Sequence, residues 1–214
     1  ALPIFGCNVY QYAVDKTTVR SRLQTVSIPL APRDTTRTIR VARIQYKGTW
    51  DIEPFGWTRL RNYLSNETGT LLLVTSGITF DSEALKDFDV AHLTGTDAFE
   101  LTDAEVAGLR RFLTGGGTLI ADAAGGNRGF TESLERYLED ALRSRPELLT
   151  PDSYVLTGAG IPDAVDLKDA EYRRAARGAA GGREYPRIKA FAGRRRIYAL
   201  YSPLDLSTGL IGTP

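Results

Sequence analysis

The sequence predicts an α/β fold with a mostly parallel sheet that helices cover on both faces. Apolar strand patterns alternate with amphipathic helix patterns over residues 40–143, as in βαβ units. A hairpin pattern follows near the C-terminus, and no internal repeat interrupts the series. We expect an N-terminal β arm at residues 1–38 and one α/β domain at residues 39–214.

The arm carries strand-type residues at 8–14 and 22–30, and residues 31–37 are typical of a linker. The first strand of the domain is predicted at Thr38–Tyr46, where apolar and polar residues alternate. Pro54 suits the start of the next helix, Phe55–Leu64, in which Trp57, Leu60 and Leu64 share one face. The elements expected next are a strand at 71–75, a turn or short helix at 81–86 and a strand at 89–93.

The next helix has the clearest start signal in the chain. Thr102 followed three residues later by Glu105 predicts a capping box. Val106, Leu109 and Leu113 would form the buried stripe of this helix, and the glycines at 115–117 would end it.

The segment Thr118–Phe130 has the pattern of a catalytic elbow without its reactive atom. An apolar strand, Thr118–Ala123, leads through a glycine-rich turn to a helix predicted at 131–143. Hydrolases and amidotransferases of the α/β class place a nucleophile at such a turn. Residues 123–126 are Ala-Ala-Gly-Gly, with neither Cys nor Ser.

The C-terminal third gives weaker signals. Residues 154–156 are predicted as a strand and residues 170–177 as a short helix. Residues 187–191 and 195–201 alternate around Ala192-Gly193, which indicates a β-hairpin.

Composition excludes several classes of function. With 27 Lys+Arg and 26 Asp+Glu, we expect no bulk attraction to nucleic acid. No apolar run reaches the roughly 20 residues of a membrane span. One Cys and one His exclude an internal disulfide and any site that needs two histidines, and we expect no metal and no cofactor. A chain without Met that starts at Ala1 suggests a removed upstream domain or signal peptide, which favours a periplasmic or secreted location.

Charge is unevenly distributed along the chain. Residues 81–105 hold eight acidic residues and one base, whereas residues 172–196 hold nine bases and one acid. These stretches are either two solvated faces or surfaces for a partner, and opposed faces could also support a homo-oligomer.

Six stretches of the chain carry a family resemblance: 41–46, 50–54 with 56–57, 91–96, 116–126, 202–206 and 209–212. In this order they resemble a bacterial domain-of-unknown-function family, family 4159, whose members are similar to class I glutamine amidotransferase domains. The resemblance implies a three-layer, flavodoxin-like sheet. It implies no established reaction. The Gly-x-Cys-x-Gly elbow of true amidotransferases, with its downstream His and Glu, cannot be matched here.

Polar residues follow four of the predicted strands. Ligands of open parallel sheets bind beyond the carboxyl ends of the strands, so we expect one crevice there. Its predicted lining is Trp50, Asp51, Thr96, Asp122, Gly125, Gly126, Asn127, Ser202 and Asp205. The alternative is that these residue types occur there only because turns favour them.

Asp122 and His92 each allow two interpretations, and for His92 the second is a Ser-His-Asp triad with Ser76 or Ser202, which no Gly-x-Ser-x-Gly motif supports. Asp122 interrupts an apolar strand, where a carboxylate is costly unless it is paired. It could be an acid/base with a raised pKa, or it could cap a helix or pair with an arginine. His92 is interpreted as a hydrogen-bonded core residue.

Three functions follow from these features. The leading hypothesis is a non-catalytic amidotransferase-like domain that binds a small polar ligand or a protein partner. The first alternative is a hydrolase of sugars or polar polymers that uses Asp122 with Asp51 or Glu53. The second is a self-associating scaffold.

Overall fold

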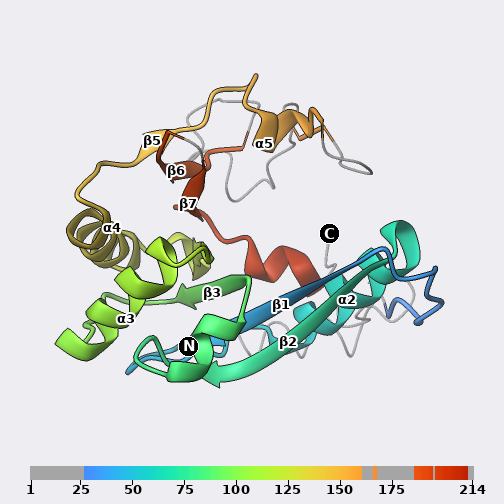
Figure 1. Ribbon diagram of the computed structural model, residues 1–214, viewed down its shortest axis with the longest axis horizontal. Helices are drawn as coiled ribbons and strands as arrows, with labels where there is room; N and C mark the ends of the chain where they lie inside the picture. The colour runs from blue at the N-terminus through green and yellow to red at the C-terminus, as the bar shows by residue number, and fades with distance from the viewer. Residues whose placement is uncertain (1–26, 161–165, 168–185, 195, 212–214) are drawn as a thin grey trace, which may run out of the picture.

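The protein forms an α/β domain around a seven-stranded mixed sheet. The computed structural model describes residues 27–160, 166–167, 186–194 and 196–211, and the sheet order is β2-β1-β3-β4-β7-β6-β5 (Figure 1). The elements are β1 (Arg37–Ile44), α2 (Pro54–Thr68), β2 (Thr70–Ile78), η1 (Glu83–Asp87), β3 (Val90–Gly95), α3 (Asp103–Thr114), β4 (Thr118–Ala123), η2 (Ala124–Gly126), α4 (Arg128–Leu142), β5 (Glu147–Leu148), α5 (Tyr154–Thr157), β6 (Lys189–Ala192), β7 (Ile197–Ser202) and η3 (Ser207–Ile211).

The prediction of a mostly parallel sheet is confirmed. Strands β2, β1, β3, β4 and β7 run parallel. The expected hairpin adds β6 antiparallel to β7, and β5 pairs antiparallel with β6 at the edge. Because five strands point the same way, their carboxyl ends meet at one edge of the sheet.

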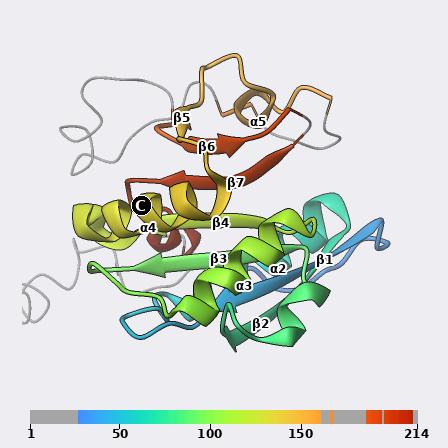
Figure 2. The same cartoon turned by 60° about the vertical axis from the view of Figure 1, so that its left-hand side comes forward.

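Helices cover both faces of the sheet. Figure 2 shows α3 and α4 on one face, with α2 behind the strands on the other. The α3–α4 face holds the larger core, which includes Leu109, Leu119, Phe130 and Leu134. The α2 face holds a smaller one, built from Val41, Trp57 and Leu72 with Leu210 of η3 packed against them. The shared face predicted for Trp57, Leu60 and Leu64 is therefore confirmed.

Local hydrogen bonds explain where the helices begin and end. The predicted capping box starts α3, since Glu105 N–H donates to Thr102 Oγ1 and Thr102 N–H donates to Glu105 Oε2. Helix α4 starts three residues earlier than predicted because the Asn127 side chain accepts from Phe130 N–H. Helix α2 extends to Thr68, where left-handed Gly69 ends it.

The strand predicted at 154–156 is wrong. These residues form the short helix α5, because the Ser153 side chain accepts from Val155 N–H and left-handed Gly158 closes the turn. The helix predicted at 170–177 and the arm strand at 8–14 lie outside the described residues.

The last part of the arm lies along α2 without strand structure. Asn62 and Asn66 of α2 donate side-chain hydrogen bonds to the carbonyls of Ile28 and Pro29, and residues 27–36 are irregular. Within the described residues, no helix has the length and apolar character needed to cross a membrane.

A close approach between α3 and the loop after β2 depends on Gly108. A methyl group there would collide with the carbonyl oxygen of Phe80. Replacing a helical glycine with alanine ordinarily favours folding by about 1 kcal/mol, whereas overpacking costs about 1–3 kcal/mol. We therefore expect Gly108→Ala to lower the urea midpoint. Ala107→Gly, at an exposed neighbour, is the control and should cost only about 0.5–1 kcal/mol. A raised midpoint for Gly108→Ala would contradict the close packing.

Candidate functional site

A row of buried polar side chains crosses the sheet near its carboxyl edge. Arg43 of β1 pairs in register with His92 of β3, and Asp122 of β4 pairs with Ser202 of β7. Their apolar neighbours on each strand belong to the α3–α4 core, so alternation directs all four toward the α2 face. Each is at most 5% exposed, which makes hydrogen-bond partners necessary.

Asp122 is fully engaged by its neighbours. Its Oδ2 accepts from Leu206 N–H at 3.0 Å and Ser207 N–H at 2.9 Å. Its Oδ1 accepts from Ser207 Oγ at 2.8 Å and lies 3.2 Å from His92 Nε2. The side chain is 2% exposed. The carboxylate therefore joins the start of η3 to the centre of the sheet.

These contacts decide the direction in which the pKa of Asp122 shifts. Burial alone would raise this pKa. The hydrogen bond and charge of His92, together with two hydrogen bonds from Ser207, outweigh burial and hold the pKa below its ordinary value. A lowered pKa favours the paired carboxylate over the acid/base role considered for Asp122.

The His92, Asp122 and Ser207 side chains are not arranged as a hydrolytic triad. In a triad the serine donates to the histidine, and the carboxylate orients the far side of the ring. Here the Ser207 hydroxyl donates to Asp122, and the same nitrogen, His92 Nε2, lies 3.2 Å from Asp122 and 3.4 Å from Ser207 Oγ. Trp57 packs edge-on against His92 with ring centroids 4.8 Å apart. His92 is the hydrogen-bonded core residue that we expected.

The turn after β4 carries no side chain at its apex. Gly125 has φ 64° and ψ 8°, and a methyl group there would meet no atom within 4 Å. Its N–H donates to Asp205 Oδ2 at 2.9 Å. Asp205 also accepts from the backbone and hydroxyl of Thr208. A second carboxylate thus connects the turn to the segment that leads into η3.

Arg43 is a central residue that the sequence did not reveal. Its guanidinium pairs with Asp51 at 2.7 Å and donates to Ser76 Oγ and the carbonyl of Ile52. The Trp50 ring lies 5.9 Å from Arg43 Cζ. The alternating pattern of β1 placed Arg43 on the polar side, but α2 covers that side as well, so the side chain is 3% exposed. Its Nε is buried without a partner among the described residues.

The remaining predicted residues serve local structure. Thr96 donates to Asp97, Asn127 caps α4, and Ser202 Oγ accepts from Leu204 N–H. Glu53, proposed as a second carboxylate, precedes α2 in a left-handed conformation with φ 50° and makes no capping bond.

The structure gathers the predicted residues into two groups. Asp122, Gly125, Ser202 and Asp205 lie around the start of η3. Trp50 and Asp51 lie around Arg43, and the register pair of Arg43 and His92 connects the groups. Two surface hollows of the described part of the chain lie elsewhere. Among those residues, no cluster of three His, Cys, Asp or Glu could hold a metal ion.

Comparison with known protein families identifies the family of this chain. A family model described as Domain of unknown function (DUF4159) matches residues 40–210, which include every strand from β1's second half to β7. No curated protein matches the chain.

The contacts of Asp122 predict a stability effect with a defined pH dependence. Asp122→Asn replaces one carboxylate oxygen with an NH₂ group, so either the backbone N–H groups of Leu206 and Ser207 or the Ser207 hydroxyl lose their acceptor, at about 1–3 kcal/mol for each buried donor left unpaired. Because the folded pKa is lowered, the carboxylate stabilises the fold above about pH 4, and this contribution is lost as pH falls through the folded pKa. Urea unfolding at pH 7 and pH 3 measures the free energy of unfolding of both proteins. The difference between wild type and variant should be smaller at pH 3 than at pH 7.

Asp140→Asn is the matched control. Asp140 is half exposed and pairs with the surface arginines Arg110 and Arg143, so its loss should cost no more than about 0.5 kcal/mol. Equal effects of the two variants would contradict the structural role of Asp122.

Proposed function

The chain belongs to the DUF4159 family, and from this premise we propose that it is a non-catalytic, glutamine amidotransferase-like domain of flavodoxin-like architecture. On this proposal the loops at the carboxyl edge of the sheet bind a small polar ligand or a protein partner. The sheet order supports the architecture, because β2-β1-β3-β4-β7 places the first strand inside the parallel part and creates a switch point between β1 and β3.

The empty elbow is the observation that carries this proposal. The residues with positive φ in the turn after β4 are Gly125 and Gly126, so no nucleophile stands where an amidotransferase would need one. The carboxylates around the turn are already engaged, since Asp205 accepts from Gly125 and Thr208 and buried Asp122 has four hydrogen-bonding groups around it, from three residues. A group in that state neither attacks nor exchanges protons readily with a substrate.

Strain in the loop after β1 supports binding at the same edge. A left-handed conformation costs a residue with a Cβ roughly 1–2 kcal/mol, and residues held in this way cluster at ligand-binding sites. Glu53 is such a residue, next to Trp50 and Asp51. Beyond it, Phe55 is 77% exposed, and Leu206 before η3 is 45% exposed. Large exposed apolar side chains near a polar loop favour a partner surface.

The alternative functions have less support. A hydrolase with paired carboxylates needs an acid and a base that face the substrate, but Asp122 is buried and Asp51 is paired with Arg43. For the scaffold, the acidic side chains of residues 81–105 lie at the surface, whereas most of the basic stretch 172–196 lies outside the described residues. Both functions stay predictions.

We expect no catalysis from the empty elbow. Purified protein incubated with glutamine, or with p-nitrophenyl esters and anilides, should show no turnover above the buffer rate, because the turn offers no nucleophile. Asp122→Asn should leave that background unchanged. Turnover that disappears in the Asp122→Asn variant, when the variant remains folded by circular dichroism, would contradict the proposal.

The strain at Glu53 gives a separate test of the binding edge. If the left-handed conformation is kept for binding rather than for folding, Glu53→Gly should stabilise the protein by up to roughly 1 kcal/mol, since glycine adopts positive φ without the Cβ penalty. Denaturant unfolding measures this. Arg143→Gly is the control, because Arg143 is also left-handed but ends α4 on the surface. A loss of stability in Glu53→Gly alone would show that the Glu53 side chain serves the fold.

A further inference from the structure

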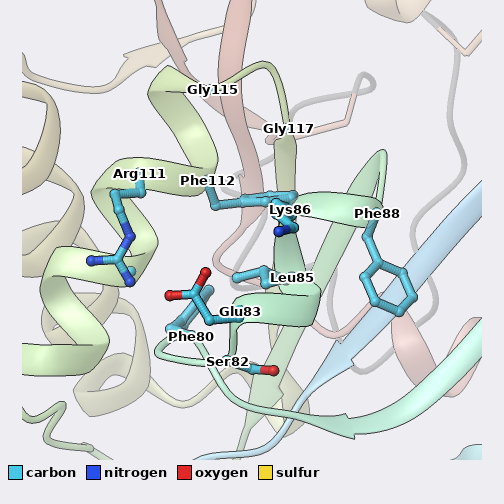
Figure 3. A pocket seen from close by; sticks show the side chains of 11 residues that line it. Phe80, Ser82, Glu83, Leu85, Lys86, Phe88, Arg111, Phe112, Gly115 and Gly117 are labelled. Atoms are coloured by element: carbon cyan, nitrogen blue, oxygen red, sulfur yellow. The ribbon is translucent and has the colours of Figure 1, made fainter.

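A cavity separate from the carboxyl edge lies between η1 and α3. Its volume is about 190 Å³. Phe88, just before β3, and Gly117, just before β4, are among the residues that line it (Figure 3). The cavity therefore extends toward the amino ends of these strands, and none of the residues discussed above as a site lines it.

The floor of the cavity is apolar. Phe80, Leu85 and Phe112 line it and are 1%, 2% and 6% exposed, and half-buried Phe88 adds a third ring. Gly108, also in the lining, lets α3 approach the backbone of Phe80. Binding an apolar group against such a floor is favourable, because it removes apolar surface from water. Since cavities for drug-sized ligands measure about 300–1,000 Å³, this cavity suits a group of fragment size.

The rim carries charges of both signs. Glu83 and Lys86 of η1 and Arg111 of α3 line the opening and are exposed. Figure 3 shows the Arg111 guanidinium and the Glu83 carboxylate on the same side of the opening, with the Lys86 ammonium apart from them. Within the described part of the chain, these three side chains form no ion pair. Their hydrogen-bonding capacity is thus available to a ligand.

We propose that this cavity binds an apolar α-amino acid. The zwitterion matches the rim, since its carboxylate would meet Arg111 and its ammonium would meet Glu83 on the same side of the opening. Its apolar side chain would lie on the phenylalanine floor. Because the rim charges are exposed, each ion pair adds modestly, and we expect binding in the millimolar range. A peptide terminus shares half of this chemistry, but it lacks either the free carboxylate or the free ammonium.

Ligand analogues separate these chemistries. In a ¹⁵N-HSQC titration, L-phenylalanine should shift the amides of residues 82–88 and 115–117 saturably. We expect roughly two- to five-fold weaker binding of phenethylamine, which lacks the carboxylate, and of 3-phenylpropionate, which lacks the ammonium. L-Serine, which has no apolar side chain, should give no saturable shift at this cavity.

Charge-removing variants assign the roles of the rim residues. Arg111→Gln should lower the affinity for L-phenylalanine and 3-phenylpropionate two- to five-fold, which is roughly the value of an exposed ion pair. The affinity for phenethylamine should stay unchanged. Glu83→Gln should lower the affinity for L-phenylalanine and phenethylamine and leave the affinity for 3-phenylpropionate unchanged. Arg110→Gln is the matched control, since Arg110 pairs with Asp140 on the far side of α3, and it should change none of the three affinities.

Three results would overturn the proposal. The first is the absence of saturable shifts with L-phenylalanine. The second is equal affinity for all three aromatic ligands, which would indicate an apolar hollow without recognition of the zwitterion. The third is preferential binding of either analogue, which would assign the cavity to a peptide terminus instead.

Discussion

The fold depends on keeping one carboxylate in the middle of a hydrophobic sheet. Asp122 lies on β4, the central strand of the described sheet order, and it is 2% exposed. An unpaired carboxylate in such a place would cost several kcal/mol. The backbone amides of Leu206 and Ser207, the Ser207 hydroxyl and the His92 ring together remove that cost. The position of η3 against α2 follows from these contacts.

Backbone hydrogen bonds to carboxylates also limit the chemistry of the carboxyl edge of the sheet. Asp205 repeats the pattern of Asp122, since its oxygens accept from Gly125 and Thr208. Asp122 and Ser202, which the sequence offered as part of a ligand crevice, are bound instead by the backbone of the segment that follows β7. What remains accessible at this edge is the glycine turn and the strained loop that contains Trp50, Asp51 and Glu53.

Sequence patterns predicted the elements well where a local signal decides them. The capping box at Thr102, the strand at 118–123 and the hairpin around Ala192 are all present. The pattern failed at residues 154–156, where side-chain capping by Ser153 overrode strand propensity. It also failed to show that Arg43 is buried, because alternation along β1 does not tell whether a helix covers the polar side.

The candidate site was harder to predict than the fold because its contacts join distant parts of the chain. Asp122 could be recognised as an unusual residue, but its partners lie 84 and 85 residues away. Nothing near Leu206 or Ser207 in the sequence indicates that they would bind a carboxylate on another strand. The sequence left two roles open for Asp122, and its long-range contacts favour the structural one.

The pKa of Asp122 tests the central claim most directly. A carboxylate that serves as a structural tie is held in its ionised form by its donors, whereas a general acid needs a raised pKa. Titration of the Asp122 side-chain carbon by ¹³C NMR, assigned with the Asp122→Asn variant, gives this value. If Asp122 is a structural tie, we expect a pKa below the ordinary value of about 3.9 for Asp. A pKa raised above that value would contradict it and support an acid/base role.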